Sequence, residues 1–161
     1  MNEQFDIKKV KVYRTLEGTI FEFAFLVVLI AVWVFIIIAL QKAPDVVPTH
    51  FDGAGHATSY DSKYSILFAT IVTSVGGIIM LGCAYFPHKI NMPVKIKTPR
   101  QYLLAIRMVR VLSLVLLVLT AVIAHTSLVA YNEPSAVPIL GTVGVMFAVI
   151  VIFSVLIFKA K

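Results

Sequence analysis

Residues 23–40 read FAFLVVLIAVWVFIIIAL, a run of 18 residues without a charged, hydroxyl or amide side chain. An α-helix rises about 1.5 Å per residue, so roughly 20 such residues cross the hydrocarbon layer of a bilayer, which is about 30 Å thick. A globular core does not need an apolar run of this length. The stretch therefore predicts a membrane-spanning helix, which we place at Thr19 to Leu40.

Three further apolar runs predict spans at Tyr64 to Phe86, Val111 to Val129 and Pro138 to Phe158. Hydrophobic residues make up 60% of the chain and charged residues 14%, and the mean hydropathy is +0.95, unlike a soluble domain. The runs are apolar on every side, whereas strands of a membrane barrel alternate apolar and polar residues. The sequence thus predicts an all-α membrane protein, one integral membrane domain over residues 1–161, folded as a four-helix bundle.

The lysine and arginine residues are distributed unequally between the segments that connect the spans. Twelve of the fourteen lie in the N-terminal arm, in the connection 87–110 or at the C-terminus. The connection 41–63 holds only Lys42 and Lys63, and the connection between the third and fourth spans holds none. Short loops rich in Lys and Arg stay in the cytoplasm, so we predict that both termini are cytoplasmic and that the loop 41–63 lies outside.

A pI near 9.6 often indicates nucleic-acid binding, but here the positive residues flank spans, where anionic headgroups attract each of them by about 1 kcal/mol. We therefore predict the lipid bilayer, and no nucleic acid, as a partner.

Thr98 and Pro99 are typical of a helix start. A helix that begins there extends the third span below the bilayer as a basic ledge. Its role is either lipid anchoring or contact with a cytoplasmic protein. The residues of this basic cytoplasmic face are Lys95, Lys97, Arg100, Arg107 and Arg110.

The loop between the first two spans reads APDVVPTHFDGAGHATSYDSK over residues 43–63. Pro44 and Pro48 disfavour a helix, and Asp52-Gly53 and Gly55 are typical of tight turns. We expect a short ordered cap over the end of the bundle rather than a loose tether.

Two blocks of residues resemble bacterial membrane proteins related to the SdpI-type immunity proteins. The first is Val47-Pro48-Thr49-His50-Phe51 followed by Gly55, Tyr60 and Lys63, and the second is Asn91-Met92-Pro93-Val94-Lys95-Ile96 followed by Gln101-Tyr102 and Arg107-Met108. The resemblance covers about residues 43–110 and lies in a domain of unknown function. It implies a small helical protein of the bacterial inner membrane whose VPTHF loop is extracytoplasmic. Its best understood members protect a cell from a secreted toxic peptide and relay that event across the membrane.

The loop offers side chains for three roles, which the sequence leaves open. His50, Asp52 and His56 carry imidazole and carboxylate groups that bind transition metals, but their spacing matches no established zinc pattern. The same groups can instead form the hydrogen bonds that shape a turn. A third role is direct ligand contact, for which the candidate residues are Pro48, His50, Phe51, Asp52, Gly55, Tyr60 and Lys63.

Inside the spans, two features predict how the helices pack. Glu17 and Glu22 lie at the cytoplasmic end of the first helix, at the depth of Arg107 and Arg110 in the third, which predicts interhelical ion pairs. Small residues let helices approach closely in lipid, and they are most frequent in the second span. We therefore expect the second span to be the central helix, with Gly141 and Gly144 giving the fourth a similar face.

Three classes of function follow from these observations. The first is a binding protein whose outer loop recognises an extracytoplasmic peptide or envelope component, conferring immunity or relaying a signal. The second is a metal-dependent membrane enzyme that uses His50, Asp52 and His56, and the third is a passive subunit of a membrane complex. Because the chain shows no Ser-His-Asp order, no phosphate-binding glycine loop and no His-Glu-x-x-His pattern, we predict no enzyme, no catalytic residues and no cofactor.

Overall fold

The computed structural model describes residues 11–86, 88 and 94–160. In this part of the chain, four helices are long and apolar enough to cross a membrane, which confirms the predicted fold class. The elements in chain order are α1 (Leu16–Lys42), β1 (Val46–Phe51), β2 (Ala57–Ser62), η2 (Lys63–Ser65), α2 (Ile66–Cys83), α3 (Pro99–Ala124), η4 (His125–Val129) and α4 (Val137–Lys159). The contributions expected from Lys8, Lys9, Lys89, Lys161 and the block Asn91-Met92-Pro93 lie outside the described residues.

Polar caps fix the start of two helices. The Thr15 hydroxyl accepts a hydrogen bond from the Gly18 N–H at 3.1 Å. At the start of α3, Thr98 accepts from the Gln101 N–H while the Gln101 side chain accepts from the Thr98 N–H, which together form a capping box. Such a cap stabilises a helix by about 1 kcal/mol. The predicted helix start at Thr98-Pro99 is therefore confirmed. Arg100, Arg107 and Arg110 of the predicted basic face lie in α3, whereas Lys95 and Lys97 precede it.

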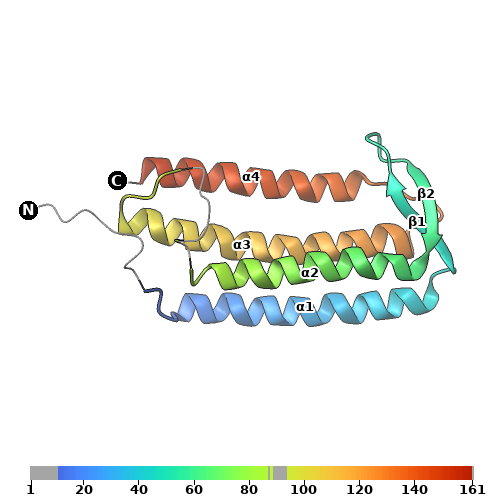
Figure 1. The fold of residues 1–161 in the computed structure, drawn as a ribbon, viewed down its shortest axis with the longest axis horizontal. Coiled ribbons are helices and arrows are strands. Elements are labelled where there is room, and N and C mark those ends of the chain that lie inside the picture. The colour runs from blue at the N-terminus through green and yellow to red at the C-terminus, as the bar shows by residue number, and fades with distance from the viewer. Residues whose placement is uncertain (1–10, 87, 89–93, 161) are drawn as a thin grey trace, which may run out of the picture.

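The central helix of the bundle is α3, because it contacts α1, α2 and α4 and lies between α1 and α4 (Figure 1). In its most apolar window 44% of the residues are buried, against 22% in α1 and in α2 and none in α4. The expectation that the second span is central was wrong. Small residues permit a close approach without enforcing it: an added Cβ at Gly77 would meet Phe25 and Ser113, but Gly82 has open space around it.

Buried hydroxyl groups line the interfaces of α3 and α2. Thr120 of α3 donates to Thr73 of α2 at 2.8 Å, and the indole N–H of Trp33 in α1 donates to Ser74 at 3.1 Å. Interhelical hydrogen bonds of this kind contribute up to about 1 to 2 kcal/mol in a membrane. These two hydrogen bonds therefore connect α2 to α3 and to α1.

The loop after α1 is a two-stranded antiparallel hairpin that lies across one end of the bundle, where α1 ends and α4 begins (Figure 1). The start of α1, the start of α3 and the end of α4 lie at the opposite end. The loop had been expected to be ordered, but no strands were predicted for it. Pro48 and the turn residues obscure the alternation of apolar and polar residues that indicates a strand. The strands pair with Val47 opposite Asp61 and Pro48 opposite Tyr60, and the register shifts around His50.

Candidate functional site

The hairpin is anchored to the bundle by the inner face of β1. Val47 is fully buried, and it belongs to a core with Ile36 of α1, Ile66 of α2 and Leu128 of η4. Pro48 is also fully buried. Burying an aliphatic side chain of this size contributes roughly 1.5 to 3 kcal/mol. Pro48, one of the predicted ligand residues, is therefore covered by other residues and not available to a ligand.

The turn between the strands is held by Asp52. Its carboxylate accepts hydrogen bonds from the His56 N–H at 2.8 Å and from the Ala54 N–H at 2.9 Å, and its own N–H donates to the His56 carbonyl. These backbone donors, that of His56 above all, lower the pKa of the Asp52 carboxyl below its usual value. The turn therefore favours the ionised carboxylate, which is the form that accepts both hydrogen bonds.

Gly55 connects this turn to the start of α4. Its backbone has a φ of +92°, a conformation that side chains disfavour and glycine adopts freely. Its carbonyl accepts a hydrogen bond from the Ala136 N–H at 2.9 Å, and a Cβ on Gly55 would lie 3.4 Å from that same nitrogen. Gly55, another predicted ligand residue, thus joins the hairpin tip to the connection between the third and fourth spans.

The base of the hairpin is closed by Lys63. Its ammonium group donates to the Ala43 carbonyl at 3.1 Å and lies 3.3 Å from the Asp45 carboxylate. The Lys63 side chain is only 13% exposed, whereas that of Asp45 is 96% exposed. The mostly covered Lys63 side chain therefore closes the base of the hairpin where the chain leaves α1.

The outer strand β2 is exposed to solvent from Thr58 to Ser62. The Lys63 N–H donates to the Asp45 carbonyl at 2.9 Å, so the alternation of an antiparallel ladder makes Val47 and Asp61 the next hydrogen-bonded pair. Pro48 and Tyr60 then form a pair without ladder hydrogen bonds, which suits a proline. The N–H and C=O of Tyr60 consequently point away from β1, toward the outer edge of the hairpin.

Four of the predicted ligand residues remain accessible. Asp52 is exposed in the turn, although its carboxylate is engaged there, and the other three lie on the strands. His50 is exposed, Tyr60 is 56% exposed, and Phe51 is half-buried at the end of β1. The Nδ1 atom of His50 lies 3.2 Å from the Thr49 hydroxyl. The exposed surface therefore combines an imidazole, two aromatic rings and an unpaired strand edge.

The candidate metal ligands do not gather into one site. Asp52 and His56 face each other at 3.4 Å, but no group of three His, Cys, Asp or Glu side chains occurs in the described part of the chain. Zinc sites in proteins have at least three such ligands. The arrangement of His50, Asp52 and His56 therefore gives the metal-dependent enzyme no support.

The opposite end of the bundle carries the ion pairs predicted between α1 and α3. The Arg107 guanidinium donates twice to the Glu17 carboxylate, at 2.8 Å from Nε and 2.8 Å from Nη2, and Arg110 lies 3.9 Å from the same group. Glu22 differs from the prediction, since its partners are Arg14 at 2.6 Å and the Tyr85 hydroxyl. Arg14 and Tyr85 were not predicted as partners, because Arg14 precedes α1 and Tyr85 follows α2. The prediction considered only pairs between the first and third helices.

The predicted basic face is divided between two environments. Lys95, Lys97 and Arg100 are exposed, but Arg110 is only 4% exposed. Ten residues after Arg100 on a helix of 3.6 residues per turn, Arg110 is rotated by about 80° toward α1. There it lies against Gly18, where an added Cβ would be 2.6 Å from its Nη2 atom. Arg110 therefore belongs to the interior of the bundle.

Comparison with known proteins adds one match. Residues 27–73, which run from α1 through the hairpin into α2, match the family model described as Domain of unknown function (DUF1648). No curated protein and no solved structure matches the chain. The matched region contains the anchored β1 strand, the turn and the exposed β2 edge, so this family model is centred on the hairpin.

Proposed function

We propose that the protein is a receptor in the bacterial cytoplasmic membrane that binds an extended peptide along the outer edge of β2. The observation that carries the proposal is the orientation of the Tyr60 backbone away from β1, on a strand that is exposed along its length. An exposed edge of this kind binds a peptide by adding it as a further strand, and main-chain hydrogen bonds supply much of the affinity. His50 and Tyr60 are placed to contact its side chains.

The anchoring of the hairpin supports a receptor role. Val47 and Leu128 share one core, so a strand added to β2 acts on a hairpin that packs against the outer end of the central helix. Helix α3 continues from there to Arg107 and Arg110, which contact Glu17 of α1. The resemblance to immunity proteins favours a toxic peptide as the ligand, with protection or signalling as the outcome.

The edge-strand proposal is tested by Tyr60→Pro, which removes the outward N–H but no ladder bond to Pro48. Peptides selected from a random decapeptide phage library on the protein in lipid nanodiscs are expected to bind Tyr60→Pro about tenfold more weakly, the upper end for the loss of one main-chain hydrogen bond, since proline removes the N–H and keeps the carbonyl. The matched control is Tyr60→Ala, which keeps the N–H and loses only the ring. Thermal unfolding of both variants checks that the hairpin is intact. Equal binding to the two variants would show that the peptide does not use this edge.

The proposal also requires the hairpin to face outward, as the charge distribution favours. In a Cys83→Ser background, Gly53→Cys places a thiol on the hairpin where an added Cβ has open space, and Lys97→Cys places one on the exposed surface at the other end. A membrane-impermeant maleimide is expected to label only Gly53→Cys in intact spheroplasts and both variants after lysis. Labelling of Lys97→Cys before lysis would reverse the orientation.

A further inference from the structure

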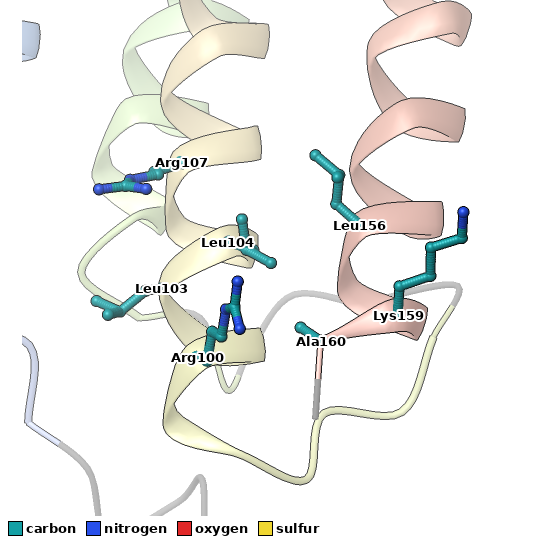
Figure 2. Close-up of a pocket in the computed structure, with 7 residues that line it drawn as sticks. All are labelled: Arg100, Leu103, Leu104, Arg107, Leu156, Lys159 and Ala160. Atoms are coloured by element: carbon teal, nitrogen blue, oxygen red, sulfur yellow. The ribbon is translucent and has the colours of Figure 1, made fainter.

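A groove of about 280 Å³ opens between α3 and α4 at the end of the bundle where α3 begins and α4 ends. Leu104 of α3 and Leu156 of α4 lie on the facing sides of the two helices, and the Arg100 guanidinium extends along the groove toward them (Figure 2). Leu103, Arg107, Lys159 and Ala160 complete the lining. The groove therefore combines three cationic side chains with leucine side chains and contains no acidic residue.

The two helix ends that form the groove are fixed to each other by Gln101. Its amide group donates to the carbonyl of Ile157 at 3.0 Å and to the carbonyl of Ala160 at 2.9 Å. Its amide oxygen accepts from the N–H groups of Lys97 and Thr98. Because Gln101 is only 8% exposed, these bonds are shielded from water. The groove is thus a built feature of the bundle and does not depend on the position of a loose terminus.

Two of the three cations in the groove have no partner within the described part of the chain. Arg107 is engaged by Glu17, but among the residues that the structure describes no ion pair or side-chain hydrogen bond involves Arg100 or Lys159. Both residues are exposed. A pair of unpartnered cations beside apolar side chains at the end of a membrane span is the arrangement that recognises a phospholipid headgroup.

An apolar track continues from the groove along α3. Positions 103, 107, 111, 114 and 118 share one side of the helix with Arg100. Apart from Arg107, which Glu17 engages, their side chains are leucine and valine that are exposed or half-buried. From residue 103 to residue 118 the helix rises about 22 Å, more than half of the roughly 30 Å hydrocarbon layer. The track is therefore long enough for an acyl chain that starts at the groove.

We infer that this groove binds an anionic phospholipid, whose phosphate lies between Arg100 and Lys159 and whose acyl chain follows the track on α3. The charge of the groove selects an anionic headgroup, and the leucine side chains match the acyl chain joined to it. An acidic protein would complement the cations but not the exposed track, which lies within the membrane span. The site is separate from the hairpin at the other end of the bundle, so the inference is independent of the proposed peptide binding.

The inference is tested by native mass spectrometry of the protein in a neutral detergent, titrated with phosphatidylglycerol. The double variant Arg100→Gln with Lys159→Gln is expected to bind this lipid about tenfold more weakly than the wild type, since each cation contributes to headgroup attraction. The control is Lys95→Gln with Lys97→Gln, which removes the same charge from exposed positions at the same end but outside the groove. In a neutral micelle we expect this control to bind like the wild type.

Three further probes identify the ligand class. Phosphatidylcholine is expected to bind weakly to all variants, and neither inorganic phosphate nor a decaglutamate peptide is expected to displace the bound lipid. Equal losses in the two double variants would show unspecific attraction and overturn the site. Displacement by inorganic phosphate would identify a site for a free anion, and displacement by decaglutamate would identify a protein-docking surface, and either result would overturn the lipid assignment.

Discussion

Replacing Gly77 by leucine is expected to destabilise the protein by about 3 kcal/mol or more, at the upper end of the range for overpacking. An added Cβ at this position lies 3.4 Å from the Phe25 ring and 3.4 Å from the Ser113 carbonyl oxygen. Neither neighbour can move easily, because Phe25 is 4% exposed and Ser113 is fully buried, with its hydroxyl bonded to the Arg110 carbonyl at 2.7 Å. The remaining atoms of leucine must therefore separate α2 from both α1 and α3.

The measurement is the free energy of unfolding in mixed detergent micelles, followed through the fluorescence of Trp33, the single tryptophan of the chain. Gly82→Leu is the matched control, since it makes the same substitution in the same helix at an exposed position with open space around it. Both variants gain the same helix propensity, about 1 kcal/mol relative to glycine, so their difference reports packing alone. Equal stabilities would mean that α2 does not pack tightly at Gly77.

The number and extent of the spans could be predicted because a bilayer imposes them. Its thickness sets the length of an apolar run, and nothing in the tertiary structure changes that requirement. The capping pattern at Thr98 was equally local, as a hydroxyl at the N-cap satisfies N–H groups that any helix start leaves unpaired. Features of this kind depend on residues a few positions apart, and the sequence displays them directly.

The central position of α3 could not be predicted in this way, because it depends on which helix faces meet. The sequence shows many small residues in α2, but only Gly77 lies at a close contact, while Gly76 and Gly82 do not. Helix α3 has larger residues, yet its buried polar side chains Gln101, Ser113 and Thr120 require partners in lipid. Gln101 and Thr120 form hydrogen bonds to other helices, which is the signal that points to the centre, whereas the Ser113 hydroxyl bonds the Arg110 carbonyl of α3 itself.

The hairpin shows a similar division between residue type and residue orientation. The turn could be predicted from Asp52, Gly53 and Gly55, since these residues suit tight turns. Which strand residues face inward depends on the register, and a shift by one residue exchanges the two faces. From the sequence, Pro48 and Lys63 therefore looked equivalent to His50 and Tyr60 as ligand residues. In the structure Pro48 is buried, and the Lys63 side chain is hydrogen-bonded to the Ala43 carbonyl.

The second large effect is expected for Glu17→Leu, which should destabilise the protein by about 3 kcal/mol. Removal of one partner from a buried ion pair costs about 3 to 5 kcal/mol because the other charge is left uncompensated, and the 40% exposure of the Glu17 side chain places this pair at the lower end. The Arg110 side chain is 5% exposed and cannot reach water. Arg107, with 52% of its side chain exposed, can be solvated. Unfolding in mixed micelles measures the loss, and Glu133→Leu at an exposed site is the control.

The double variant Glu17→Leu with Arg110→Leu is expected to be more stable than Glu17→Leu alone, by about 2 kcal/mol. Replacing both members of a buried pair by apolar side chains removes the uncompensated charge, and such replacements are often neutral. Arg110→Leu by itself should have a smaller effect than Glu17→Leu, because Glu17 keeps its two hydrogen bonds to Arg107. A double-mutant cycle gives the coupling free energy directly. If the two single losses simply add, Arg110 draws its stabilisation from other groups, and the cluster at this end of the bundle is not organised around Glu17.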